Sequence, residues 1–303
     1  MDLPSRGAIF GLEVRSHLSF EYLRSGSGRP VRVSNAPPDG TLGSLERIQT
    51  WDEEPGVHGA VHLHRCGPAA FAIESGAYWF RYDADEAAFT VQPTGDPPFR
   101  EALLWESPSA IAMVLAGDLA LHAASVDVNG GGLLISGPGR TGKTTLAAAF
   151  HAAGHRLLSD DLTGCRLDPD PALLAGSALV RLRPDSAERV DTGGLYTAWQ
   201  RPDRIYAALD PDRRGTGDPL PLRRIVLLDP ESGPFSVSEV SRPEALRDLW
   251  AMSFWLPTDE SRAACFEGLA RLVARVPAVR VRRPREWAAL PDAVAFIAEQ
   301  AAA

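Results

Sequence analysis

The stretch LLISGPGRTGKTTLAAAF, residues 133–150, decides the fold, and it contains the only lysine of the chain, Lys143. Lys and Arg total 31 residues, and all the others are arginine. A codon preference accounts for such a bias, but it does not explain why one lysine is kept at this position. The apolar LLIS, the Gly-rich GPGRTG and the run KTTLAAAFHAAG predict a strand, a loop and a helix that ends at Gly154.

Residues 137–144, GPGRTGKT, match the pattern G-x-x-x-x-G-K-[ST]. Glycines let the backbone curl so that successive N–H groups point at phosphate oxygens, and the start of the helix adds the positive end of its dipole. A lysine ammonium is a compact charge that can follow β- and γ-phosphates, and the wider arginine fork is not equivalent there. A Thr144 hydroxyl can bind Mg²⁺. The residues expected at this nucleotide site are Gly137, Gly139, Arg140, Thr141, Gly142, Lys143, Thr144 and Thr145.

Two places can supply the acid that such a loop needs. Asp160 and Asp161 end the strand-like RLLSDD, and Asp229 ends the apolar RRIVLLD, as in an ordinary P-loop ATPase. Ligands of α/β folds bind at the carboxyl ends of strands, where the chain turns and both adjacent acids can reach one crevice. Two neighbouring carboxylates repel unless a cation or a shared proton compensates. Mg²⁺ with a nucleotide supplies that cation, so one acid can hold metal while the other accepts a proton from a hydroxyl.

Composition excludes several classes of protein. The chain has 303 residues, of which 45% are hydrophobic and 23% charged, as in soluble globular proteins. A net charge of −8 argues against a general nucleic-acid or anionic-membrane binder. No apolar run has membrane-spanning length and the N-terminus lacks a signal-like core, so we expect a cytoplasmic protein. Three scattered cysteines indicate no disulfide framework.

The chain divides into a β-rich region over residues 1–105 and an α/β nucleotide-binding core over 106–303. The first region includes a hairpin turn in RYDADEAAF, residues 81–89, and is followed by a helix over 101–116. In the core, LALHAASVDV and LLIS read as strands joined by a tight turn at NGGG, and residues 184–220 read as a long loop. Further strands are expected at LTGCRL, ALVRL, RRIVLLD and AVRVRR, and further helices near 243–254, 258–275 and 289–301.

Taken together, residues 121–167, LHAASVDVNGGGLLISGPGRTGKTTLAAAFHAAGHRLLSDDLTGCRL, resemble the HPr kinase/phosphorylase family. The resemblance implies a core like the C-terminal domain of that family, with ATP and Mg²⁺ as cofactors. By this resemblance Lys143 and Thr144 bind phosphate and Mg²⁺, Asp160 is the general base and Asp161 the metal-side acid. His122, on the strand before the loop, then lies near the phosphates or the acid pair.

The resemblance has limits within the chain. The family's glycine-rich segment with its metal-binding glutamate has no counterpart, because the chain reads ALVRLRPDSAERV over 178–190. The resemblance therefore does not extend to the phosphorylase activity. The segment LVRLRPD is instead similar to HPr-kinase-like kinases of ribosomal, lasso-type peptide precursors, which implies a contact of Arg181 or Arg183 with the nucleotide or the phosphorylated product.

These observations lead to three functional hypotheses. The first is an ATP- and Mg²⁺-dependent kinase that phosphorylates a hydroxyl, a serine, of a peptide or small-protein acceptor, with the β-rich region as a candidate recognition surface. The second is a nucleotide-binding regulatory module without transfer, and the third is a P-loop ATPase that uses Asp229. We expect no nucleic-acid or membrane partner, and the sequence is compatible with a homo-oligomer.

Overall fold

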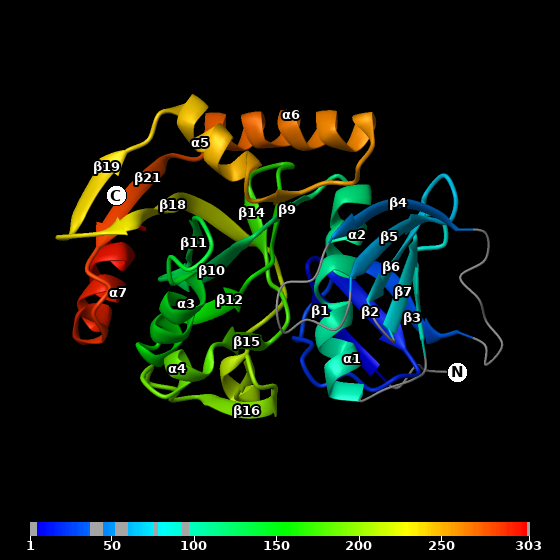
Figure 1. The fold of residues 1–303 in the computed structure, drawn as a ribbon, viewed down its shortest axis with the longest axis horizontal. Helices are drawn as coiled ribbons and strands as arrows, with labels where there is room; N and C mark the ends of the chain where they lie inside the picture. The colour runs from blue at the N-terminus through cyan, green and yellow to red at the C-terminus, as the bar shows by residue number, and fades with distance from the viewer. Residues whose placement is uncertain (1–4, 37–44, 52–59, 76–77, 93–96, 302–303) are drawn as a thin grey trace.

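The computed structural model describes residues 5–36, 45–51, 60–75, 78–92 and 97–301. Figure 1 shows two large sheets side by side, one built from the N-terminal strands and the other from the later strands. The mixed α/β class predicted from the sequence is confirmed. Among the described residues, no helix combines the length and the apolarity needed to cross a bilayer.

The N-terminal sheet has eight strands in the order β1-β2-β3-β8-β7-β6-β5-β4. Its strands are β1 Ser5–Ile9, β2 Leu12–Ser16, β3 Arg29–Asn35, β4 Glu46–Trp51, β5 Val61–Arg65, β6 Ala70–Ser75, β7 Tyr78–Asp83 and β8 Ala88–Val91. The hairpin turn predicted in RYDADEAAF is present between β7 and β8, which pair antiparallel. Alternation of apolar and polar residues along β2 and β7 buries one face of the sheet.

Two helices replace the single helix expected over 101–116. They are α1 Pro97–Leu104 and α2 Ser107–Leu115, and α2 packs on β6, β7 and β9. The break falls at Glu106, whose φ of −105° and ψ of −124° are not helical. Pro108 explains the restart, because proline is tolerated in the first turn of a helix and not in its interior. In α1, the buried Glu101 carboxylate accepts hydrogen bonds from the amides of Glu21 and Tyr22 and from the indole of Trp105.

The second sheet has ten strands, of which β11, β18 and β21 run parallel. Its strands are β9 Leu119–Leu121, β10 Ala123–Val128, β11 Gly131–Ser136, β12 Arg156–Ser159, β13 Thr163–Arg166, β14 Ala172–Leu174, β18 Leu220–Ser232, β19 Ser236–Glu239, β20 Ser253–Phe254 and β21 Ala278–Arg283. The tight turn predicted at NGGG joins β10 to β11, with φ of 54° at Asn129 and 83° at Gly130. Positive φ at both central residues is the signature of a type I′ hairpin turn.

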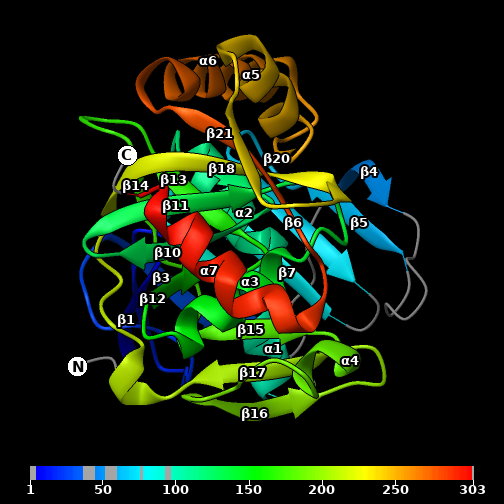
Figure 2. The same ribbon diagram turned by 90° about the vertical axis from the view of Figure 1, so that its left-hand side faces the viewer.

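Helices cover both faces of the ten-stranded sheet. They are α3 Lys143–Ala152 and α7 Leu290–Glu299 on one face, and α5 Arg242–Trp250 and α6 Asp259–Arg275 on the other (Figure 2). Strand β11 shows why: Leu133 and Ile135 pack into the same cluster as α3 and α7, whereas Leu134 packs with α6. Successive residues of a strand point to opposite faces, so a continuous apolar run such as LLI packs against helices on both faces of the sheet.

The loop predicted for residues 184–220 is wrong. The segment contributes two strands, β16 and β17, which form a three-stranded sheet with the preceding β15 in the order β15-β17-β16. Its strands are β15 Leu179–Leu182, β16 Leu195–Gln200 and β17 Ile205–Leu209, with short helical turns at α4 Pro184–Ala187 and η1 Pro211–Arg213, and η2 Trp287–Ala289 precedes α7. Trp199 stacks on Phe99 of α1, with ring centroids 4.6 Å apart, and lies 4.9 Å from the ring of Tyr206. Packing of these rings stabilises strands that the Pro- and Gly-rich sequence does not favour by itself.

Candidate functional site

The Gly-rich loop lies between β11 and the first residue of α3, as predicted. Gly137 has φ of 153°, Arg140 has φ of 66° and Gly142 has φ of 92°. The last two values lie in the left-handed region, which an L-residue enters only at a cost. The Arg140 side chain is exposed, and Thr145 follows in the first turn of α3.

Lys143 is folded back onto this loop. Its Nζ donates to the carbonyl of Gly137 at 2.8 Å and to that of Pro138 at 3.2 Å. Thr141 Oγ1 donates to the same Pro138 carbonyl at 2.8 Å. Burial lowers the pKa of the Lys143 ammonium, and the carboxylates of Asp161 and Asp160 oppose that shift. Both acids of the predicted pair therefore act electrostatically on the lysine.

A residue from the far end of the chain supports the loop. Arg283, in the last position of β21, donates from Nη2 to the carbonyl of Thr141 at 3.2 Å and is buried. A Cβ atom added to Gly142 would lie 2.5 Å from that guanidinium nitrogen. Gly142 is thus required both for its left-handed backbone and for the space that Arg283 fills. The sequence analysis missed this contact, because the two residues are far apart in the chain.

Asp160 follows β12 and is buried. Its Oδ2 accepts a hydrogen bond from the backbone N–H of Arg181 at 3.0 Å. In the described part of the chain, no hydrogen-bond partner reaches its buried Oδ1. Burial raises the pKa of Asp160, and the neighbouring charge of Asp161 raises it further. Strand β11, which ends at the Gly-rich loop, and strand β12, which ends at Asp160, both pair antiparallel with β10, so the loop and the acid pair leave the sheet at the same edge.

Asp161 has different surroundings from its neighbour. His122 Nδ1 lies 3.1 Å from Oδ1, and Arg181 Nη1 donates to Oδ2 at 2.7 Å. Although burial acts to raise it, the hydrogen bond from His122 and the charge of Arg181 hold the pKa of Asp161 well below its usual range. His122 was predicted within a strand and instead occupies the bend between β9 and β10, where its backbone N–H donates to the Met252 carbonyl at 2.7 Å. The bend leaves its ring free to turn toward Asp161.

Arg181 and Glu106 complete the cluster. Arg181 projects from β15, and its Nη2 lies 2.8 Å from Glu106 Oε1. Although burial opposes it, the charges of Glu106 and Asp161 raise the pKa of Arg181 above its usual range. Burial raises the pKa of Glu106 to about 7, against the charge of Arg181. Of the two arginines suggested by the sequence, Arg181 joins the acid pair and Arg183 is exposed.

Sequence reasoning missed Glu106. The only local signal is its place at the N-cap of α2, where Ser, Thr, Asp or Asn is preferred and where it makes no side-chain capping bond.

The alternative acid, Asp229, has other partners. Its Oδ2 accepts from Arg282 at 3.0 and 3.1 Å, and its Oδ1 accepts from the amide of Glu231 at 2.9 Å. That backbone hydrogen bond and the Arg282 contact lower the pKa of Asp229. The carboxylate is thus engaged by Arg282 of the neighbouring strand β21 and by its own strand rather than by Lys143 or Thr144.

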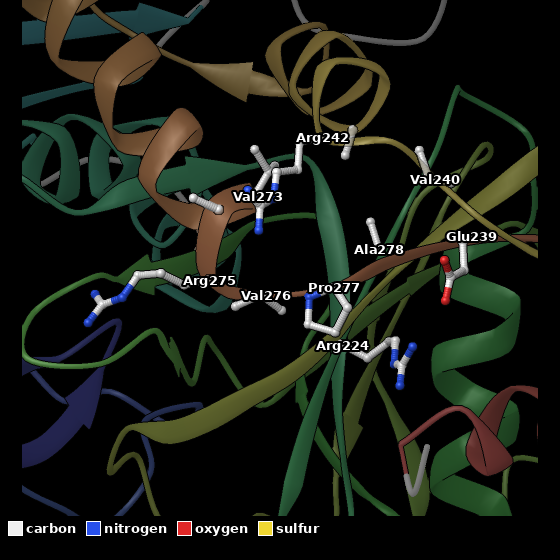
Figure 3. Close-up of a pocket in the computed structure, with 11 residues that line it drawn as sticks. Arg224, Glu239, Val240, Arg242, Val273, Arg275, Val276, Pro277 and Ala278 are labelled. Atoms are coloured by element: carbon white, nitrogen blue, oxygen red, sulfur yellow. The ribbon is translucent and has the colours of Figure 1, made fainter.

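A cavity of about 280 Å³ lies away from this site, between the N-terminus of α5 and the C-terminus of α6 (Figure 3). Arg224, Glu239 and Arg242 are among the residues that line it. The lining includes neither the phosphate loop nor the acid pair.

Comparisons with known proteins find a distant likeness over part of the chain. No family model matches the chain. Over 103 residues the chain is 31% identical to an HPr kinase/phosphorylase of Lachnoclostridium phytofermentans, a match that covers 34% of this chain and 29% of that protein. The chain therefore spans less than a third of the length of the curated relative it matches.

A solved structure, the HPr(Ser) kinase/phosphatase of Coxiella burnetii, aligns at 14% identity. The alignment covers 59% of this chain and 94% of that one, with a TM-score of 0.33. An overlap of this size does not define a shared fold. The finding is thus a distant similarity to HPr kinase/phosphorylase in sequence, and the local geometry has to carry the functional argument.

Proposed function

We propose that the chain is an ATP- and Mg²⁺-dependent kinase that transfers the γ-phosphoryl group to a hydroxyl, a serine, of a peptide or small protein. One observation carries the proposal: the strand that ends at the Gly-rich loop, β11, and the strand that ends at Asp160, β12, both pair antiparallel with β10, so the loop and the acid pair leave the sheet at the same edge. A phosphate loop next to a buried acid that can accept a proton is what phosphoryl transfer to a hydroxyl requires. The similarity to HPr kinase/phosphorylase supports the same reaction class.

The residues present fit a magnesium nucleotide. Lys143 Nζ donates hydrogen bonds to two loop carbonyls and can donate to phosphate oxygens instead. Gly137 and Gly142 give the loop its curled backbone. The Thr144 hydroxyl in the first turn of α3 and the ionised Asp161 carboxylate would hold the metal, and the buried Asp160 Oδ1, which has no partner in the described chain, is open to the acceptor hydroxyl. Oxygen donors of this kind are the ligands of Mg²⁺, which keeps several waters and phosphate oxygens in such sites. Mg²⁺ would neutralise charge on the transferring phosphoryl group.

The two acids suit different roles. Asp160 has the raised pKa of a group that can accept a proton, whereas Asp161 stays ionised between His122 and Arg181. We assign Asp160 as the base that takes the acceptor hydroxyl proton as its oxygen forms the bond to the γ-phosphorus. The bond from that phosphorus to the β–γ bridging oxygen breaks, and ADP leaves. Asp161 supplies a fixed negative charge on the metal side of the pair.

The nature of the acceptor is part of the proposal. The likeness of LVRLRPD to kinases of lasso-type precursor peptides favours a ribosomal peptide, with the β-rich residues 1–105 as the recognition region and 106–303 as the catalytic one. Kinase activity is proposed without phosphorolysis, because residues 178–190 do not contain the glycine-rich segment of the phosphorylases.

Transfer is tested with purified protein, [γ-³²P]ATP, Mg²⁺ and a panel of serine-containing peptides. We expect label in a peptide and a mass gain of one phosphoryl group. Asp160→Asn should abolish labelling while calorimetry still detects Mg·ATP binding, because the amide cannot accept the proton. Loss of binding in that variant would instead assign Asp160 to the metal, and full labelling would contradict the proposed base. Binding without transfer to any acceptor would favour the regulatory module.

A further inference from the structure

Arg181 lies between two carboxylates that come from different parts of the chain. Its Nη1 holds Asp161 at 2.7 Å, and its Nη2 holds Glu106 at 2.8 Å. The guanidinium is planar and its nitrogens have fixed directions, so an anion bound at one nitrogen limits how the other can turn. The side chain of Arg181 is 16% exposed and that of Glu106 is 26% exposed, so water competes little for either contact. The placement of Asp161 therefore depends on Glu106.

Asp161 needs such support. Its φ of 67° is left-handed, a region that L-residues enter only at a cost, although Asp tolerates it better than most. Residues held in sparsely populated backbone regions persist only where their surroundings over-determine them. The surroundings here are His122, which is 46% exposed, and Arg181. Arg181 is the less exposed of the two, and its guanidinium is held by the Glu106 carboxylate and by the ring of Tyr206, whose centroid is 6.0 Å away.

Glu106 is itself placed by the N-terminal half of the molecule. It precedes α2, and α2 packs on β6 and β7 of the eight-stranded sheet as well as on β9 of the larger sheet. Its carboxylate makes no capping bond to the helix it begins, so its side chain is free to reach Arg181. A helix that contacts both sheets thus carries the anion that orients the catalytic cluster.

We propose that Glu106 is a positioning residue of the acid pair, which holds Arg181 against Asp161 and so makes the catalytic geometry depend on the packing of α2 against the N-terminal sheet. This inference rests on the proposed kinase function. It gives the N-terminal half a role in catalysis that is separate from recognition of the acceptor.

The test is a double-mutant cycle in the full-length protein, with Glu106→Ala and Arg181→Met as the single changes. We expect Glu106→Ala to lower kcat about 10-fold, the size of effect seen when a partner of a site ligand is removed, and to leave the KM for ATP within about twofold. In the Arg181→Met background the same change should lower kcat no further, because Glu106 acts only through Arg181. Equal losses in both backgrounds, or no loss in either, would overturn the proposal.

Two more variants separate positioning from general damage. Glu106→Gln keeps an oxygen that can accept from Arg181 Nη2, so it should recover most of the kcat lost in Glu106→Ala. A Gln variant as impaired as the Ala variant would contradict a positioning role. The matched control is Asp248→Ala, which removes a similarly exposed ion pair with Arg280, away from the acid pair, and should leave kcat unchanged.

A structural readout keeps the inference apart from the proposed function. If the wild-type protein phosphorylates no acceptor, the kinase proposal fails, but a crystal structure of Glu106→Ala still tests whether Glu106 holds Arg181 against Asp161. The inference expects Arg181 Nη1 to leave Asp161 Oδ2 in that structure. An unchanged contact near 2.7 Å would refute it whatever the activity.

Discussion

Replacement of Gly142 by alanine tests the geometry of the phosphate loop most sharply. Gly142 has φ of 92°, and an added Cβ would lie 2.5 Å from Arg283 Nη2. The left-handed backbone costs alanine about 1–2 kcal/mol. Displacement of Arg283 also breaks its hydrogen bond to the Thr141 carbonyl, which for a charged donor contributes about 1.5–3 kcal/mol.

The loop relieves this strain only if it leaves the curled conformation, and the curled conformation is the one proposed to bind phosphate. The two contributions sum to about 2.5–5 kcal/mol, so we expect the Kd for Mg·ATP to rise by about 100-fold or more. Isothermal titration calorimetry measures the Kd, and chemical denaturation measures the free energy of unfolding.

Gly154 provides the matched control. It lies just after α3 with φ of 93°, and an added Cβ would meet nothing within 4 Å. Gly154→Ala should therefore lose about the same backbone free energy as Gly142→Ala and keep its nucleotide affinity. Equal affinity for Mg·ATP in the Gly142 variant and the wild type, or an equal loss in both variants, would refute the reasoning.

Three further outcomes follow from the described contacts. Lys143→Met removes the ammonium and keeps the apolar stem. Mg·ATP binding measured by calorimetry should weaken by at least about 10-fold, because a hydrogen bond to a charged group is worth about 1.5–3 kcal/mol. Unchanged affinity would exclude the loop as the nucleotide site. Asp229→Asn should leave phosphotransfer within about twofold, because its carboxylate contacts Arg282, and a loss like that of Asp160→Asn would restore the ATPase hypothesis. Burial raises the pKa of Glu101 to about 7 from a usual 4.5, so its contribution to stability is fully present below that usual value and is lost as the pH rises through 7. Relative to Glu101→Gln, the wild type should lose about 2 kcal/mol of unfolding free energy between pH 5 and 8, and a flat difference would contradict the raised pKa.

Local patterns in the sequence predicted the Gly-rich loop and Asp160 of the candidate site. Contacts between distant segments bring Glu106 and Arg283 to it. The loop and Asp160 lie within one strand-helix-strand unit, so their spacing along the chain was sufficient to place them in the same candidate site. Glu106 reaches the same cluster from a helix outside that unit, and no local pattern distinguishes it from a surface acid. Residues 184–220 were read as a loop because Pro, Gly and Asp are frequent there, whereas the packing of Trp199 on Phe99 decides the structure.

A crystal structure with Mg²⁺ and a non-hydrolysable ATP analogue tests the central claim most directly. The account predicts that Lys143 Nζ leaves the carbonyls of Gly137 and Pro138 for phosphate oxygens, with the metal beside Thr144 and facing the acid pair. A metal on Asp229, or a nucleotide bound anywhere other than the loop, would contradict it.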